Sequence, residues 1–186
     1  MKVTCVLGSP REEGNSSKIA ARLCSSMQAK GAETRIFFLN KLRYVGCQSC
    51  MACKDKSEVC VIKDDLTEVL SDVKSSDVII LASPIFFGDV SGQLKCFIDR
   101  SYSYLTLDYK SRLIPGKKLV MVLSQGNPDS KRYGDVFIRY DEFFQWHKFK
   151  SSHLIRSFYS PEKKGTPLEE PLRQAEQLAA KFMAGA

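Results

Sequence analysis

Short apolar runs alternate with stretches of helical periodicity along the chain, and this alternation limits the possible folds more than any other feature. The first, third and fourth predicted strands are nearly all apolar, which is typical of central parallel strands covered on both faces. The fifth alternates and is more polar, so we expect it at an edge. Strands that alternate with helices predict a doubly wound α/β sheet. The predicted strands are Val3–Leu7, Thr34–Leu39, Val78–Ala82, Lys118–Leu123 and His153–Tyr159.

Five further segments carry apolar side chains at helical spacing. Five strands and five helices favour an α/β flavodoxin-like fold, a five-stranded parallel sheet in the order 2-1-3-4-5, over the six-stranded dinucleotide-binding fold. No linker or repeat divides the 186 residues, so we predict a single domain over 1–186. The helical stripes are Ile19, Leu23 and Met27; Leu66, Val69, Leu70 and Val73; Leu94, Phe97, Ile98 and Leu105; Val136, Tyr140, Phe143, Phe144 and His147; and Leu172, Ala175, Leu178, Ala179 and Phe182.

The composition indicates an intracellular globular protein. Hydrophobic residues make up 44% of the chain, but no apolar run approaches the ~20 residues that span a bilayer, and the N-terminus does not resemble a signal peptide. The net charge of +7 comes with no nucleic-acid-binding motif. We therefore expect a cytoplasmic protein without nucleic-acid or membrane partners. Seven cysteines in such a protein favour metal or redox chemistry over structural disulfides.

Three loops follow the carboxyl ends of predicted strands, where an open α/β sheet binds its ligands. They are Gly8–Ser17, Ser83–Asp89 and Ser124–Asp129, and all are rich in Gly, Ser, Pro or Asn. Another connection, from Asn40 to Lys63, is far longer than usual and has a cysteine-rich part over 44–63. Long connections in compact domains are usually functional or disordered, so we expect a function here.

The first loop predicts a phosphate site. A loop of small residues that leads into a helix leaves unpaired N–H groups and a partial positive charge at the helix start. Five residues separate Gly8 from Gly14, and Pro10 interrupts the glycine spacing, so neither a P-loop nor a dinucleotide fingerprint is present. A single terminal phosphate, as in FMN, fits better. The alternative is a capped helix without a ligand.

The second loop places Phe86, Phe87 and Gly88 where a ligand would lie. An isoalloxazine ring requires an apolar wall and a few backbone donors, and a glycine permits close backbone approach. The alternative is that the two phenylalanines belong to the core.

A set of motifs in these segments resembles the NAD(P)H-dependent FMN reductase-like flavoproteins over roughly residues 1–155. The motifs are Gly8-Ser9-Pro10-Arg11, Gly14-Asn15-Ser16, Pro84-Ile85-Phe86-Phe87-Gly88, Ser91-Gly92-Gln93-Leu94-Lys95, Phe97-Ile98-Asp99-Arg100 and Gln125-Gly126-Asn127-Pro128. The resemblance implies a flavodoxin-like fold, bound FMN and NAD(P)H as co-substrate. Phe86 departs from the family pattern, which often has Tyr there.

The same resemblance implies the residues of the flavin site. The phosphate is expected at Ser9, Arg11, Asn15, Ser16 and Ser17. The ring is expected against Pro84, Ile85, Phe86, Phe87 and Gly88, with Gln125, Gly126 and Asn127 on its other side. We expect no catalytic side chain, because the chemistry is centred on the flavin.

The most specific local pattern is Cys47-x2-Cys50-x2-Cys53-x6-Cys60. Its first three cysteines match the C-x2-C-x2-C run of [4Fe–4S] ferredoxins, whereas structural zinc more often uses two separated C-x2-C knuckles. The spacing also resembles the iron–sulfur flavoprotein subgroup of the same family, which implies a [4Fe–4S] cluster on these four cysteines near the flavin. Free or redox-active thiols and zinc remain open as alternatives.

Other residues near these motifs favour structural roles. Cys5, Cys24 and Cys96 fit buried small apolar positions. Lys54 and Lys56 either raise the potential of a cluster or are solvated loop lysines.

Asp99 and Arg100, at the end of a predicted helix, are more typical of a structural ion pair than of a catalytic pair. His147 and His153 lack metal-ligand spacing and fit ordinary core-edge or surface positions.

The expected function is that of an FMN-dependent oxidoreductase. Electrons from NAD(P)H or a reduced ferredoxin would pass through FMN, and through the cluster if it is present, to a small acceptor such as a quinone or oxygen. A non-enzymatic electron carrier and a metal-thiolate regulatory module are the open alternatives. Loops open to solvent beside the flavin, together with the family resemblance, imply a homodimer or homotetramer.

Overall fold

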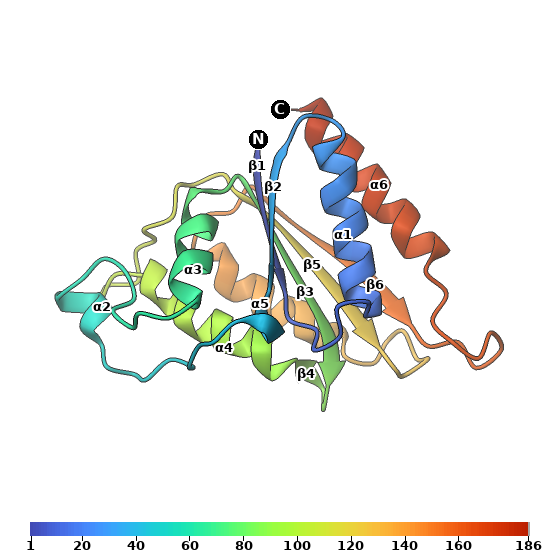
Figure 1. The fold of residues 1–186 in the computed structure, drawn as a ribbon, viewed down its shortest axis with the longest axis horizontal. Helices are drawn as coiled ribbons and strands as arrows, with labels where there is room; N and C mark the ends of the chain where they lie inside the picture. The colour runs from blue at the N-terminus through green and yellow to red at the C-terminus, as the bar shows by residue number, and fades with distance from the viewer. Residues whose placement is uncertain (186) are drawn as a thin grey trace.

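Five parallel strands form the centre of the protein in the computed structural model, which describes residues 1–185 (Figure 1). Their order across the sheet is β2-β1-β3-β5-β6, which confirms the predicted arrangement and puts the last strand at an edge. Val3 lies beside Val78, and Val78 beside Lys118, so the carboxyl ends of the three central strands meet at one edge of the sheet. The strands are β1 (Lys2–Leu7), β2 (Glu33–Phe38), β3 (Val78–Phe86), β5 (Lys118–Gln125) and β6 (Ser151–Phe158).

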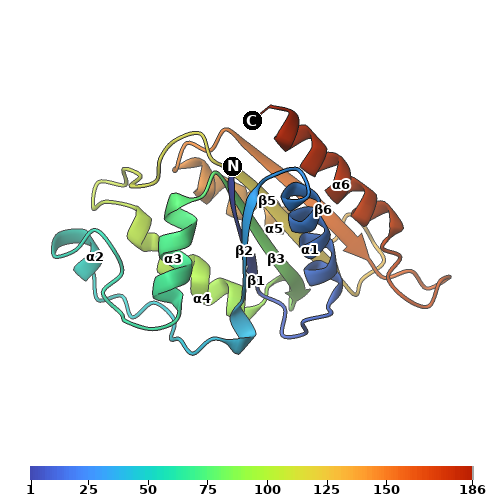
Figure 2. The ribbon, with the colours of Figure 1, turned by 45° about the horizontal axis from the view of Figure 1, so that its top comes forward.

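Helices cover both faces of this sheet (Figures 1 and 2). Residues of β3 alternate between two cores: Ile79 and Leu81 pack with α3, α4 and α5, whereas Ile80 and Ala82 pack with α1 and α6. Burial on both faces explains why the strand is apolar at every position. No helix within residues 1–185 is both long and apolar enough to cross a membrane. The helices are α1 (Asn15–Gln28), α3 (Leu66–Ser75), α4 (Gly92–Arg100), α5 (Gly134–Gln145) and α6 (Glu169–Ala184).

Two of the predicted helical stripes extend beyond their helices. α4 ends at Arg100 and is followed by a 3-10 turn, η2 (Ser101–Tyr104), so Leu105 lies outside it. α5 ends at Gln145, so His147 lies past its end. Both side chains are buried after the chain has left the helix, and periodicity alone does not distinguish that burial from a longer helix.

The third strand is longer than predicted. β3 continues past Ala82, because Pro84 still pairs with Ser124 of β5 and its last two residues pair antiparallel with β4 (Asp89–Val90). The segment 83–89 is therefore a strand end and a hairpin, not an open loop.

The long connection between β2 and α3 runs along α4 (Figure 2). It contains η1 (Leu39–Lys41) and the short helix α2 (Ala52–Asp55). The Tyr44 hydroxyl donates to the Gln93 carbonyl at 3.5 Å. Farther on, Gly46 passes so close to α4 that an added Cβ would lie 3.6 Å from the Cys96 sulfur. The predicted cysteine-rich segment is thus placed against α4.

Candidate functional site

Gly8 brings the first loop into contact with the start of α4. Its N–H donates to the Ala82 carbonyl at 2.8 Å, and its carbonyl accepts from the Ser91 hydroxyl at 2.6 Å. A Cβ atom on Gly8 would lie 2.6 Å from the Cβ of Leu94, which no side chain tolerates. Glycine therefore permits the close approach of β1, β3 and α4 at the carboxyl edge of the sheet.

In the rest of this loop, two serine hydroxyls donate hydrogen bonds to the same carbonyl, that of Arg11. The Ser9 hydroxyl donates to the Arg11 carbonyl at 2.8 Å and accepts from the Arg11 N–H at 3.1 Å. The Ser17 hydroxyl donates to the same carbonyl at 3.3 Å. Both serines are buried, whereas Arg11 is exposed. Ser9 and Ser17 thus shape the loop, and the Arg11 guanidinium lies at its rim.

The first turn of α1 fits a phosphate. The helix begins at Asn15 after Gly14, which supplies no side-chain cap, and its first turn has no acidic side chain. The Ser16 hydroxyl is buried and has no hydrogen-bond partner among residues 1–185. A buried hydroxyl without a partner costs about 1–3 kcal/mol, a cost that a ligand oxygen bound at this position would remove. The unpaired N–H groups and the helix dipole favour an anion at the same place.

The second predicted loop is a hairpin with an aromatic tip. Pro84 is buried at the end of the sheet, whereas Phe86 is 46% exposed and Phe87 fully exposed. The alternative that either phenylalanine belongs to the core is therefore wrong. Phe87 and Gly88 have φ of +48° and +84°, as in the two-residue turns that connect tight hairpins. Phe87 is strained in this conformation, since only glycine adopts it freely.

The side chains of the third loop mainly hold the loop itself. The Gln125 amide donates to the carbonyls of Asn127 and Asp129, both at 2.9 Å, and its oxygen accepts from Arg156 at 2.6 Å. The Asn127 side chain accepts from the Asp129 N–H at 2.9 Å. Gly126 is exposed, so this loop presents mainly backbone to a ligand. The three loops lie together at the carboxyl edge of the sheet.

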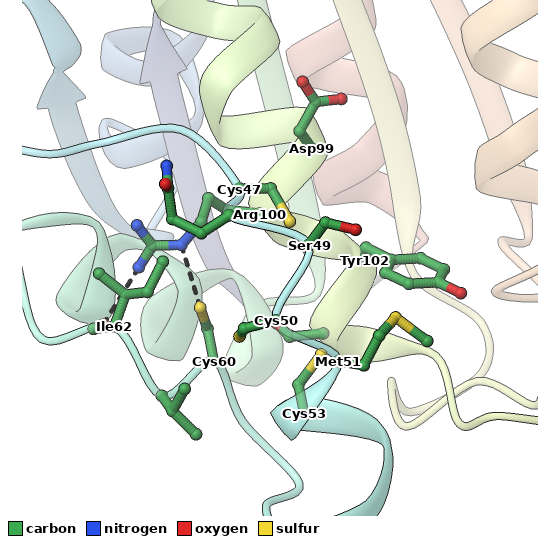
Figure 3. A pocket seen from close by; sticks show the side chains of 13 residues that line it. Cys47, Ser49, Cys50, Met51, Cys53, Cys60, Ile62, Asp99, Arg100 and Tyr102 are labelled. Carbon is green, nitrogen blue, oxygen red and sulfur yellow. Dashed lines mark hydrogen bonds between the residues drawn. The ribbon is translucent and has the colours of Figure 1, made fainter.

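All four cysteines of the predicted motif line one cavity (Figure 3). It has a volume of about 60 Å³ and lies against the end of α4. Cys47 and Cys50 are exposed, and Cys53 and Cys60 are half-buried. Within residues 1–185, no three Cys, His, Asp or Glu side chains converge closely enough to hold a single metal ion. The four cysteines thus line one shared cavity, and no three of them meet around a single point among the described residues.

The backbone between the first and third of these cysteines turns twice through the left-handed region. Ser49 has φ of 51° and Met51 has φ of 55°, and α2 begins directly after Met51. Left-handed turns of this kind point neighbouring N–H groups into one concavity, as in many phosphate and iron–sulfur sites. Each costs of order 1 kcal/mol in a non-glycine residue, so the surrounding contacts must hold it.

Arg100 connects the two arms of the cysteine loop (Figure 3). Its Nε donates to Cys60 Sγ at 3.0 Å, and its Nη atoms donate to the Asp64 carboxylate at 2.8 and 3.1 Å. It also donates to the carbonyls of Val45 at 2.9 Å and Ile62 at 3.2 Å. The Arg100 side chain is completely buried, so its charge depends on these partners. Burial opposes ionisation of Asp64, but hydrogen bonds from Arg100 and Val45 lower its pKa overall.

Lys54 and Arg112 attach the cysteine loop to the segment after α4. The Lys54 ammonium donates to the Tyr102 carbonyl at 2.5 Å and lies 3.4 Å from the centre of the Tyr102 ring. Arg112 donates to the Cys53 carbonyl at 2.9 Å. Burial lowers the pKa of Lys54, and burial raises the pKa of Cys53, with the charge of Lys54 in opposition. Lys54 is thus an anchor and not a solvated lysine, whereas Lys56 is exposed.

α4 separates the cysteine cavity from the phosphate loop. Leu94, in the first turn of the helix, faces Gly8, and Arg100, its last residue, lines the cavity. The 9 residues of α4 extend about 13 Å. The predicted cluster site and the phosphate loop therefore lie at opposite ends of α4.

The remaining cysteines have two different environments. Cys5 and Cys24 are buried, as predicted, and hydrogen bonding with Cys24 together with burial raises the pKa of Cys5. Cys96 is partly exposed, so the prediction of a buried residue is wrong. Its sulfur faces Gly46 on the side of α4 that the cysteine loop covers.

Asp99 and Arg100 both have structural ion pairs, but not with each other. Asp99 accepts from Lys95 one turn earlier at 2.5 Å, and Arg100 pairs with Asp64. Sequence analysis missed Asp64 as a partner, because it lies thirty-six positions away in a loop. The spacing of three residues between Phe97 and Arg100 could have indicated that Arg100 lies on the buried face of α4 and needs a buried partner.

The two histidines have structural environments. His147 is buried, and its Nδ1 lies 2.8 Å from the Ser111 hydroxyl. Burial lowers the pKa of His147 to about 4. His153 is half-buried, 3.1 Å from the Ser151 hydroxyl, and burial lowers its pKa as well.

Solved structures with this fold include flavin enzymes. The chain superimposes on an FMN-dependent NADH-azoreductase from Bacillus anthracis in complex with FMN, with a TM-score of 0.74 and 14% identity, over 98% of this chain and 100% of that one. It superimposes on an NAD(P)H:quinone oxidoreductase from Methanothermobacter marburgensis with a TM-score of 0.72 and 14% identity, over 96% and 97% of the two chains. These matches show the flavodoxin-like fold.

Sequence comparison finds closer relatives. An iron-sulfur flavoprotein of Methanocaldococcus jannaschii is 41% identical over 101 residues, which are 54% of this chain and 52% of the relative. An iron-sulfur flavoprotein of Methanosarcina thermophila is 37% identical over the same shares. The match thus spans about half the length of these curated relatives. Residues 1–131 match the family model for NADPH-dependent FMN reductase, and the chain belongs to that family.

Proposed function

We propose that this protein is an FMN-dependent oxidoreductase that takes electrons from NAD(P)H and delivers them to a small acceptor through a [4Fe–4S] cluster on Cys47, Cys50, Cys53 and Cys60. The observation that carries the proposal is the cavity lined by all four thiols at the end of α4. The family match over residues 1–131 and the names of the relatives support it.

FMN would be held at the carboxyl edge of the sheet. The first turn of α1 and the unpartnered Ser16 hydroxyl fit its phosphate, with Asn15 and the Arg11 guanidinium at the rim of the same loop. The hairpin tip at Phe86 and Phe87 and the backbone around Gly126 fit its ring. When bound, FMN supplies two-electron exchange with a nicotinamide and one-electron exchange with a metal cluster.

The cysteine loop would hold the cluster in a preorganised pocket. Arg100 donates to Cys60 Sγ, and hydrogen bonds to ligand sulfurs are one of the ways in which a protein sets a cluster's potential. The Lys54 ammonium, fixed on Tyr102, adds positive charge beside a cluster whose ligands are anionic. A ferredoxin in place of NAD(P)H as donor is a variant of the same proposal.

We also propose that the protein acts as a homodimer or homotetramer. The support is the aromatic tip of the β3–β4 hairpin, where Phe86 and Phe87 are exposed. A second copy that covers this tip would shield both the phenylalanines and a flavin ring packed on them.

Anaerobic purification with FMN, iron and acid-labile sulfide measured per chain tests the proposal. Cys53→Ser should remove the iron and retain the FMN, whereas Cys96→Ser, a change outside the cavity, should retain both. Iron content that is unchanged in Cys53→Ser would contradict the cluster assignment. A purified protein that contains no flavin would contradict the proposal as a whole.

Steady-state NAD(P)H oxidation by the loaded protein separates an enzyme from a carrier. We expect turnover with an artificial acceptor such as ferricyanide. Loaded protein that shows no turnover with NADH or NADPH and any acceptor would favour a flavodoxin-like carrier.

A further inference from the structure

A second, larger cavity lies beside the cysteine cavity, between α4, α5 and the segment after α4. It has a volume of about 610 Å³. We refer to it as the aromatic groove, because its walls include Tyr102, Tyr109, Phe143, Phe144, Trp146 and His147.

Three aromatic rings of this groove are exposed to solvent. Tyr109 is 58%, Phe143 55% and Trp146 45% exposed. Trp146 packs edge-to-face with both of the others, with ring centroids 5.7 Å from Tyr109 and 5.4 Å from Phe143. Edge-to-face packing fixes the rings relative to one another. The groove is thus an ordered aromatic surface, of the kind that marks a ligand or interaction site when it is left exposed.

The groove has almost no net charge. Lys95 and Asp99, the ionised side chains that line it, neutralise each other in an ion pair of 2.5 Å. His147 is bonded to Ser111 and is uncharged at neutral pH, because burial lowers its pKa to about 4. A charged ligand would have no unpaired opposite charge to bind on these walls. An apolar ligand has only a small free-energy cost of desolvation.

We propose that the aromatic groove is a binding site for an uncharged planar aromatic molecule of two or three fused rings. Its volume lies in the range of pockets that enclose small molecules, which are lined mainly by apolar and aromatic side chains. Flat rings stack against aromatic walls with a gain beyond simple burial. The groove is open to solvent on one side, and its volume and the absence of an unpaired charge on its walls favour a small uncharged molecule.

The aromatic groove shares a wall with the cysteine cavity. Cys47 and Ser49 line both the groove and the cysteine cavity, so a molecule in the groove lies next to the proposed cluster site. The groove runs along α4 from Lys95 to Asp99, and none of the residues expected at the FMN phosphate or ring lines it. The binding proposal itself requires neither FMN nor iron.

Energy transfer from Trp146 tests the proposal, because Trp146 is the single tryptophan of the sequence. The probe is acridone, an uncharged three-ring molecule, added to the purified protein with saturating FMN so that the flavin site is filled. We expect saturable quenching of Trp146 together with sensitised acridone emission. Trp146→Phe should abolish the sensitised emission, while acridone anisotropy still reports binding.

Two variants of α5 form a matched pair. Phe143 and Ile138 are both exposed, at 55% and 65%, but only Phe143 lines the groove. Phe143→Ala should weaken acridone binding about tenfold, and Ile138→Ala should leave it unchanged. Equal effects of the two variants, or no saturable transfer in the folded protein, would overturn the proposal.

The same samples distinguish a ligand site from a contact between copies. If sedimentation shows an oligomer that Phe143→Ala dissociates, and acridone does not bind, the groove is an interface and the proposal is wrong. Because the signal comes from Trp146, the result is independent of iron content and of NAD(P)H turnover, so its failure is separable from failure of the proposed function.

Discussion

The Nε atom of Arg100 lies 3.0 Å from the sulfur of Cys60, and the same guanidinium holds both oxygens of Asp64. The buried Arg100 guanidinium therefore holds Cys60, the fourth cysteine of the motif, and also Asp64, which lies just before α3. Removing either member of a buried pair leaves the other unpaired, at a cost of about 3–5 kcal/mol.

We expect Arg100→Gln to reduce the iron content per chain and to make the cysteine loop susceptible to proteolysis, while FMN content remains unchanged. The reason is that Cys60, Asp64 and two loop carbonyls lose their common donor. Arg173→Gln, in an exposed ion pair on α6, is the control. Iron content and loop proteolysis equal to those of Arg173→Gln would show that Arg100 does not position the loop.

We expect Asp64→Asn to destabilise the protein at pH 7 and to destabilise it less at pH 3. The pKa of Asp64 is lowered in the folded protein, so its stabilising contribution is complete above its unfolded value near 4 and is lost as the pH falls through its folded value. Urea unfolding of the wild type and the variant at pH 7 and pH 3 measures the difference. A difference that is the same at both pH values would contradict this account.

Ser16→Ala should weaken FMN binding about fivefold to tenfold, because the buried hydroxyl has no partner other than the expected phosphate. Ser25→Ala changes an exposed serine of the same helix and should have no effect. Fluorescence titration of the flavin-free protein with FMN gives both affinities. If the loss of affinity is equal in the two variants, Ser16 is not a phosphate ligand.

Gly8→Ala should destabilise the fold by about 1–3 kcal/mol, since the added Cβ would lie 2.6 Å from the Cβ of Leu94 and 2.9 Å from the Ser91 hydroxyl. Gly92→Ala is the matched change, because no described atom lies within 4 Å of its added Cβ and the residue begins α4. That variant should be neutral or slightly stabilising. Chemical denaturation of both proteins checks the prediction.

The wild type should lose stability as the pH falls from about 6.5 to 4, and His147→Gln should show less of this loss. The pKa of His147 is lowered to about 4 by burial, so the unfolded chain binds a proton before the folded protein does. The size of the effect is at most about 3 kcal/mol. Denaturation midpoints between pH 4 and 7 test it, and identical slopes for both proteins would exclude His147 as the cause.

Much of the fold could be predicted from local sequence patterns. Strand order and the meeting of the three predicted ligand-binding segments at one edge of the sheet were predictable, because full burial of a parallel sheet requires continuous apolar runs and parallel strands end at the same edge. The ends of elements were less predictable. β3 continues to Phe86 because a neighbouring strand still pairs with it, a contact that its own sequence does not contain.

The sequence by itself therefore determined the α/β class, the family motifs and the four cysteines as a group. Only the tertiary structure decided that Phe86 and Phe87 are exposed on a hairpin tip and that the cysteines lie at the far end of α4 from the phosphate loop. It also decided that Arg100, forty residues after Cys60, is the donor to its sulfur. The physical reason is that periodicity and spacing report which face of an element is buried, whereas partners distant in sequence meet only after the sheet and its helices have packed.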